Sequence, residues 1–140
     1  MIFGANAAGF VVAAQANAWL LRRYSGRDIL RVALGTHLVV ASAMLALNLV
    51  TYQMPVALAA TLFAQLACSG FSSANAVAAA MSRAQNNAGA AAALNGIVQF
   101  VAAACAGALV GYFDNGTPMP MVAVIFSLSL AGTLARLAAR

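Results

Sequence analysis

The chain of 140 residues is 64% hydrophobic and only 6% charged, with a net charge of +5. Such a composition cannot cover the surface of a soluble domain, because too few polar side chains are available to face water. The seven basic residues are all arginines, and they lie in or beside short polar breaks between apolar stretches. A nucleic-acid surface would instead need a basic groove interleaved with aromatic side chains. The composition therefore predicts an integral membrane protein.

Five apolar stretches follow one another, each about as long as a helix that crosses a bilayer. They cover approximately residues 1–21, 29–52, 55–80, 89–112 and 120–138. Pro55, Pro118 and Pro120 mark helix starts, where a missing N–H costs nothing. The segment Asp114–Gly116 is typical of a tight turn. We therefore expect an all-α membrane protein with five transmembrane helices, in a single region that covers residues 1–140.

Basic and non-basic breaks alternate along the chain, as five true spans require. The basic breaks hold Arg22, Arg23, Arg27 and Arg31, then Arg83, and finally Arg136 and Arg140. The positive-inside rule makes this side cytoplasmic, so we expect a cytoplasmic C-terminus and a periplasmic N-terminus. Because Met1 opens within apolar sequence, we also expect that preceding spans are missing and that the chain is a fragment.

The stretches differ in side-chain size. The second and fifth are rich in Leu, Val, Ile and Met, whereas the other three are rich in Ala, Gly, Ser, Asn and Gln. Large aliphatic helices can face lipid at no cost, while small residues let helix backbones approach closely. Small residues recur at four-residue spacing on these three stretches. The expected packing positions are Gly9, Ala13, Cys68, Ser72, Ala103, Gly107 and Gly111.

Uncharged polar residues occur inside the apolar stretches, where each needs a partner because the bilayer offers no water. Helical geometry aligns several of them on common faces. Two interpretations stay open: hydrogen bonds that only hold the helices together, or a polar lining of a water-filled substrate path. The candidate substrate-cavity residues are Asn6, Asn17, Gln65, Ser69, Asn95 and Gln99.

Other chemistry finds little support in the residues. His37 lies a few residues into the second stretch, near its basic end, and it has no acidic neighbour. We therefore expect an interfacial or locally bonded histidine rather than a proton carrier. Cys68 and Cys105 lack metal-ligand spacing and predict small buried side chains. No nucleotide loop, nucleophile elbow or metal motif is present, so we expect no enzyme, no cofactor, no metal and no nucleic-acid partner.

Two segments carry a resemblance to a known family. The first is FGANAAGFVVAAQANAWLLRRYSGRDILR, at residues 3–31. The second is GFSSANAVAAAMSRAQNNAGAAAALNGIVQF, at residues 70–100, followed by a Gly-rich stretch and the turn DNGTPMPM at 114–121. Both resemble the C-terminal half of Bcr/CflA-type drug efflux transporters of the major facilitator superfamily, over essentially the whole chain.

The resemblance implies twelve helices in two halves, of which this partial bundle would supply helices eight to twelve. It implies a drug:proton antiporter of the bacterial cytoplasmic membrane that works by alternating access. Its partners would be membrane lipids, small amphipathic drugs, protons and the missing N-terminal half, where the family's proton-coupling acids are assigned. Arg22, Arg23 and Arg27 would act in the cytoplasmic loop as gate residues or topology anchors. Leu21 and Asn17 stand where that loop motif usually has Asp and Gly.

An alternative function stays open. The five helices could form a stand-alone membrane interaction protein without transport activity, whose small-residue ridges would be its oligomer faces. A membrane-embedded enzyme would need a catalytic acid, a metal-ligand set or a nucleophile–base pair, and the sequence shows none of these.

Overall fold

A computed structural model describes residues 2–50, 55–82 and 87–138 of the chain. Its five helices are α1 (Ile2–Leu20), α2 (Gly26–Val50), α3 (Pro55–Met81), α4 (Ala88–Tyr112) and α5 (Met119–Ala138). No strand occurs among the described residues. The all-helical class and the five expected helices are confirmed. The predicted end of the second helix at residue 52 lies outside the described residues, as do Arg83 and Arg140.

Helix α2 begins three residues earlier than the sequence predicted, because a cap forms at Ser25. The Asp28 backbone N–H donates to the Ser25 hydroxyl at 3.2 Å, and this hydroxyl donates to the Asp28 carboxylate at 2.7 Å. The Ser-x-x-Asp spacing is that of a capping box, which satisfies free N–H groups at a helix start. A carboxylate there is also stabilised by the helix dipole. Polar residues that we assigned to the break therefore form the first turn.

Four of the helices are long and apolar enough to cross a membrane: α2, α3, α5 and residues 89–112 of α4. In the part of the chain that the structure describes, α1 is not among them, and it carries the polar side chains Asn6, Gln15 and Asn17. The four apolar helices support the prediction of a membrane protein. A fifth span at α1 stays a prediction.

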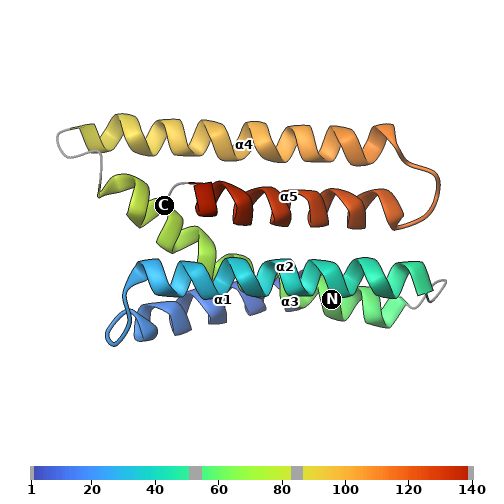
Figure 1. Cartoon of the computed structure of the whole chain (residues 1–140), viewed down its shortest axis with the longest axis horizontal. Helices are drawn as coiled ribbons and strands as arrows, with labels where there is room; N and C mark the ends of the chain where they lie inside the picture. Colours follow the sequence, from blue (N-terminus) through green and yellow to red (C-terminus); the bar gives the residue numbers. More distant parts are fainter. Residues whose placement is uncertain (1, 51–54, 83–86, 139–140) are drawn as a thin grey trace.

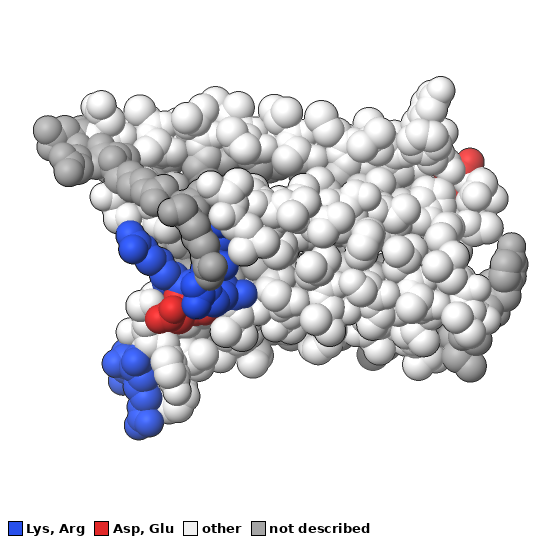
Figure 2. Space-filling model, in the orientation of Figure 1, with Lys and Arg blue, Asp and Glu red and all other residues white. Residues whose placement is uncertain are grey.

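The described arginines gather at one end of the bundle. The end of α1, the start of α2 and the end of α5 all lie there (Figure 1). These segments carry Arg22, Arg23, Arg27, Arg31 and Arg136. Figure 2 shows the basic side chains at this arginine-bearing end, with one acidic side chain beside them, and another acidic side chain at the opposite end. The alternating breaks of the sequence thus correspond to a separation of charge in space.

Helix α3 lies at the centre of the packing. It contacts α1 and α2 extensively, and α2 also packs against α5, whereas α4 makes only small contacts with α3 and α5. Figure 1 shows α4 along the outer side of α5. The buried apolar side chains among the described residues are Ala13, Ile29, Ala33, Ala41, Met44 and Val122.

Helix α2 differs from the lipid-facing helix that its composition predicted. It supplies four of those six buried side chains, and Met44 is 0% exposed. The physical reason is that Ala33 and Ala41 form a small-residue path on an otherwise bulky helix, along which its neighbours can approach. A helix rich in large aliphatic residues therefore faces lipid only where no other helix covers it.

Helices α1 and α3 approach each other closely at Gly70. A Cβ on Gly70 would lie 2.7 Å from the Phe10 carbonyl oxygen and 2.9 Å from the Ala13 Cβ. A Cβ on Gly9 would lie 2.6 Å from the ring of Phe63. The structure thus places Gly9 and Ala13 in the α1–α3 contact, together with Gly70, which the ridge analysis omitted.

The expected packing positions on α4 have a different environment. Among the described residues, nothing lies within 4 Å of a Cβ built on Gly107 or Gly111, and Ala103 is exposed. On α3, Cys68 is half-buried and Ser72 contacts α2. The small-residue ridge of α1 therefore packs within this chain, whereas that of α4 faces open space.

We predict that Gly70→Ala lowers the free energy of unfolding by about 1–3 kcal/mol, because the added methyl overlaps the backbone of α1. Gly107→Ala is the matched control. It adds the same methyl to a helix in open space, and it should leave stability unchanged or raise it by about 0.5–1 kcal/mol. Unfolding of the purified protein in detergent micelles, followed by circular dichroism, measures both. Equal stability of the two variants would contradict the α1–α3 contact.

Candidate functional site

Polar side chains from three helices meet near the middle of the bundle. His37 is the twelfth of the 25 residues of α2, Gln65 the eleventh of 27 in α3, and Ser129 the eleventh of 20 in α5. The Gln65 Nε2 donates to the Ser129 Oγ at 3.0 Å. The His37 Nε2 lies 3.5 Å from the Ser69 Oγ and 3.4 Å from the Ser72 Oγ. We call these five residues the mid-helix cluster.

His37 lies deeper than the sequence predicted. We expected it near the basic end of its helix, but the cap at Ser25 extends α2 and places His37 at the middle. Its contacts with the α3 serines are long and run between helices, so they are not the local bonds that we expected. The Ser69 and Ser72 hydroxyls also donate to backbone carbonyls one turn back, at 3.1 and 3.3 Å. Their lone pairs are therefore free to accept, which favours the histidine tautomer with its proton on Nε2.

Gln65 carries the unsatisfied group of the cluster. Its side chain is 9% exposed, and its Oε1 is buried with no partner in hydrogen-bonding geometry among the described residues, although the His37 ring lies beside the Gln65 side chain. The nearby Ser69 and Ser129 hydroxyls donate to carbonyls of their own helices, at 3.1 and 2.8 Å. A buried unpaired acceptor costs about 1–3 kcal/mol. The position therefore fits an added donor, such as a water molecule or an N–H or O–H group of a substrate.

A second polar contact joins α1 to α3, between two buried asparagine side chains. The Asn75 Nδ2 donates to the Asn17 Oδ1 at 2.7 Å and to the Phe71 carbonyl at 2.7 Å. Asn17 is 2% exposed and Asn75 is 3% exposed. For Asn17, the structure thus favours an interhelical hydrogen bond that holds the bundle together.

The remaining cavity candidates are not joined to the mid-helix cluster. Gln65 and Ser69 lie together in it, as their shared helix face predicted. Asn6 on α1 and Asn95 on α4 are half-buried, and Gln99 on α4 is exposed. Among the described residues, no hydrogen bond joins these three side chains to the cluster. Asn6, Asn95 and Gln99 therefore stay predicted cavity residues, on the basis of their positions in the helices alone.

The arginines expected at the cytoplasmic gate are exposed at the end of α1 and the start of α2. They are Arg22, Arg23 and Arg27. The guanidinium of Arg23 lies 5.6 Å from the centroid of the Trp19 ring, a cation–π distance. Tryptophan and arginine at a helix end are typical of a membrane–water interface. This geometry suits anchoring at the interface, and a gating role stays a prediction.

Sequence reasoning did not name Ser129 or Asn75 as participants in these contacts, and it expected Ser72 only as a packing position. A serine in a span can donate to its own helix, so its residue type alone does not indicate a partner on another helix. The signal that could have found the mid-helix cluster is the position of each residue along its helix. His37, Gln65 and Ser129 each lie about halfway along their helices.

The chemistry available here is binding by neutral donors and acceptors. In the described part of the chain, no group of three His, Cys, Asp or Glu side chains could hold a metal ion. The amide, hydroxyl and imidazole groups of the cluster can bind a polar ligand that carries no net charge.

Comparisons with models of known families, with curated proteins and with solved structures find no match for the chain.

We predict effects of different size for two of the three buried amides. Asn17→Leu should destabilise the protein by about 1 kcal/mol, because it leaves a buried N–H of Asn75 without its acceptor. Gln65→Leu removes an unpaired acceptor together with the hydrogen bond that the Gln65 Nε2 donates to Ser129, so stability should fall by less than for Asn17→Leu or stay unchanged. Unfolding in detergent micelles tests both. If Gln65→Leu is as destabilising as Asn17→Leu, then Gln65 has a structural role and the assignment of an unsatisfied site fails.

Proposed function

We propose that the chain forms the C-terminal part of a multidrug efflux transporter of Bcr/CflA type, a drug:proton antiporter of the bacterial cytoplasmic membrane. The observation that supports this proposal is the mid-helix cluster with its unpaired Gln65 Oε1. Secondary transporters bind their substrates near the bilayer midplane, between helices that later move apart. A buried polar group without a partner is costly and is typical of a functional site in a membrane.

The chemistry of the cluster suits a small amphipathic drug. Gln65, Ser69 and His37 offer hydrogen-bonding groups without a full charge, and the surrounding helices are apolar. In this proposal Gln65 accepts a hydrogen bond from the drug, and Asn17 with Asn75 holds α1 against α3. Protons would be carried by acidic residues of the N-terminal half. Arg22, Arg23 and Arg27 would anchor or gate the cytoplasmic side.

The surface of α4 supports a partial bundle. Every residue from 97 to 105 is exposed, including the polar Gln99. The Gln99 amide and the small-residue face of α4 point away from the other described helices. Both indicate that more protein covers this side of α4. The N-terminal half of a transporter would supply that surface and complete the cavity.

We predict that cells expressing this chain alone do not export ethidium, because half of the cavity is missing. If the DNA upstream of the Met1 codon continues in frame through seven more spans, that longer protein should lower ethidium accumulation in an efflux-deficient strain. Gln65→Leu in the longer protein should reduce efflux severalfold at unchanged membrane abundance. Asn48→Leu is the matched control, since the Asn48 amide bonds only its own helix, to the Met44 carbonyl at 3.0 Å.

Two results would contradict the proposal, and a third would contradict the role of Gln65. Export of the dye by this chain alone would show that no second half is needed. An in-frame stop codon and a ribosome-binding site directly upstream would leave a five-helix protein. The function as a membrane interaction protein would then be better supported than transport. Equal efflux by the Gln65→Leu and Asn48→Leu variants would remove Gln65 from the binding site.

The uncovered face of α4 also favours the second candidate function, a membrane interaction protein that associates through its small residues. In that case Gly107→Leu combined with Gly111→Leu should abolish self-association, because the bulky side chains keep the helices apart. Ala102→Leu combined with Cys105→Leu is the matched control on the opposite face of α4. Crosslinking and light scattering in detergent measure the association. A monomeric parent protein would exclude this function.

A further inference from the structure

The donor groups of the mid-helix cluster already have partners. The hydroxyls of Ser69, Ser72 and Ser129 each donate to a carbonyl one turn back on their own helix, at 3.1, 3.3 and 2.8 Å. The Gln65 Nε2 donates to the Ser129 Oγ at 3.0 Å. The His37 Nε2 lies 3.5 Å from the Ser69 Oγ and 3.4 Å from the Ser72 Oγ. A ligand that only accepts hydrogen bonds therefore competes with bonds that the cluster has already formed.

The free capacity of the cluster is that of an acceptor. The Gln65 Oε1 is buried and has no hydrogen-bond partner among the described residues. The cluster contains no Asp, Glu, Lys or Arg, so a ligand group with a concentrated charge would lose its hydration there without gaining a counter-ion. An N–H or O–H group without a full charge avoids this cost and pairs the Oε1. The cluster therefore favours ligands that donate a hydrogen bond.

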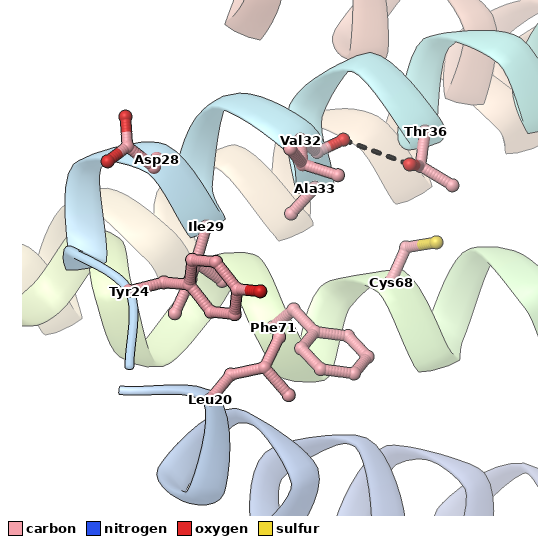
Figure 3. Close-up of a pocket in the computed structure, with 9 residues that line it drawn as sticks. All are labelled: Leu20, Tyr24, Asp28, Ile29, Val32, Ala33, Thr36, Cys68 and Phe71. Atoms are coloured by element: carbon pink, nitrogen blue, oxygen red, sulfur yellow. Dashed lines mark hydrogen bonds between the residues drawn. The ribbon is translucent and has the colours of Figure 1, made fainter. Parts of the chain in front are cut away.

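A pocket of about 470 Å³ adjoins the cluster. On α2 it extends from Asp28, in the first turn, to Thr36, which directly precedes His37. Its wall on α3 includes Cys68, which directly precedes Ser69. Figure 3 shows Thr36 and Cys68 at one end of the space and Asp28 at the other. The pocket thus leads from the arginine-bearing end of the bundle to the middle of α2 and α3.

Most of the side chains that line this pocket are apolar. They include Leu20, Ile29, Val32, Ala33 and Phe71. The Thr36 hydroxyl donates to the Val32 carbonyl at 2.9 Å, so its proton is already used (Figure 3). Gln65 lies about one helical turn beyond Cys68 on α3. The volume is within the range of small-molecule sites, and the pocket therefore has room for the apolar body of a ligand whose donor group reaches Gln65.

We propose that this site selects ligands that donate a hydrogen bond, with an aromatic amine, amide or hydroxyl group at the Gln65 Oε1 and an apolar body in the adjoining pocket. The inference takes the binding role of Gln65 from the proposed function and adds the class of drug that the site accepts. The cluster and the pocket consist entirely of residues of this chain, so binding needs no further protein.

Proflavine and acridine orange test this selection, because they share a fluorescent three-ring cation and differ at its two amino groups. Those of proflavine carry N–H donors, whereas those of acridine orange are fully methylated. Each dye is titrated with the purified chain in detergent micelles, and binding is followed by fluorescence anisotropy. We expect proflavine to bind about tenfold more tightly, which is the effect of one hydrogen bond to a buried acceptor. Equal affinities, or no binding of either dye, would overturn the inference.

Two pairs of variants separate hydrogen bonding from shape. Gln65→Leu should weaken proflavine binding about tenfold and leave acridine orange unchanged, whereas Asn48→Leu should change neither. Val32→Phe fills the pocket and should weaken both dyes severalfold, whereas Val39→Phe should weaken neither. Val32 and Val39 are 67% and 68% exposed, so both variants should fold, which circular dichroism checks. A preference for proflavine that survives Gln65→Leu, or unchanged binding to the Val32→Phe variant, would refute the site.

Failure of this inference can be distinguished from failure of the transport proposal. Equal efflux of both dyes by the longer in-frame protein would contradict selection by hydrogen-bond donors and leave transport standing. Selective binding of proflavine by a chain that has its own ribosome-binding site and an upstream stop codon would support the binding site and contradict the transporter.

Discussion

A hydrogen-bonding group inside an apolar helix bundle cannot bond to bulk water, so its partner must come from the protein. Hydroxyl groups solve this locally. Those of Ser42, Ser69 and Ser127 donate to carbonyls of their own helices at 2.7–3.1 Å. An amide carries two donors and an acceptor, and its own helix cannot satisfy all of them. The amides of Asn17, Gln65 and Asn75 are the three buried polar side chains of the described residues, and they connect α3 to α1 and to α5.

The three amides end in different states. Asn17 and Asn75 bond each other where α1 can approach α3 closely, because Gly70 leaves room for the α1 backbone. The Gln65 Nε2 donates to the Ser129 hydroxyl, whereas the Gln65 Oε1 has no hydrogen-bond partner among the described residues. A complete bond stabilises the bundle, whereas an incomplete one costs free energy until a ligand or water completes it. This contrast is the physical basis for placing structural roles at Asn17 and a binding role at Gln65.

The two ends of the bundle differ in charge, whereas its middle is held together by hydrogen bonds. The described arginines lie at one end, where the cap at Ser25 also begins α2. The Asp114 turn lies at the other end, where the Gly116 N–H donates to the Asp114 carboxylate at 3.1 Å. Gly116 has a φ of 71°, a conformation that glycine adopts without strain. An asymmetric pair of ends lets one chain hold a single orientation in a membrane.

The sequence by itself determined the five helices and most of their ends, because hydropathy, proline and turn residues act on the chain locally. Pro55 begins α3 as expected, and α5 begins beside Pro118 and Pro120. The shared face of Gln65 and Ser69 was also readable, since helical periodicity alone sets it. The start of α2 was missed although its signal, Ser25 with Asp28, is local.

Tertiary structure decided which helix lies against which, and that follows from long-range contacts that no local pattern encodes. Ser129 became the partner of Gln65 only because α5 packs against α2 and so comes within reach of the Gln65 side chain of α3. The small-residue ridge of α1 found a partner in α3, while the similar ridge of α4 did not. Spacing along one helix shows which residues share a face. Only the positions of the other helices decide whether that face is buried, bonded or open.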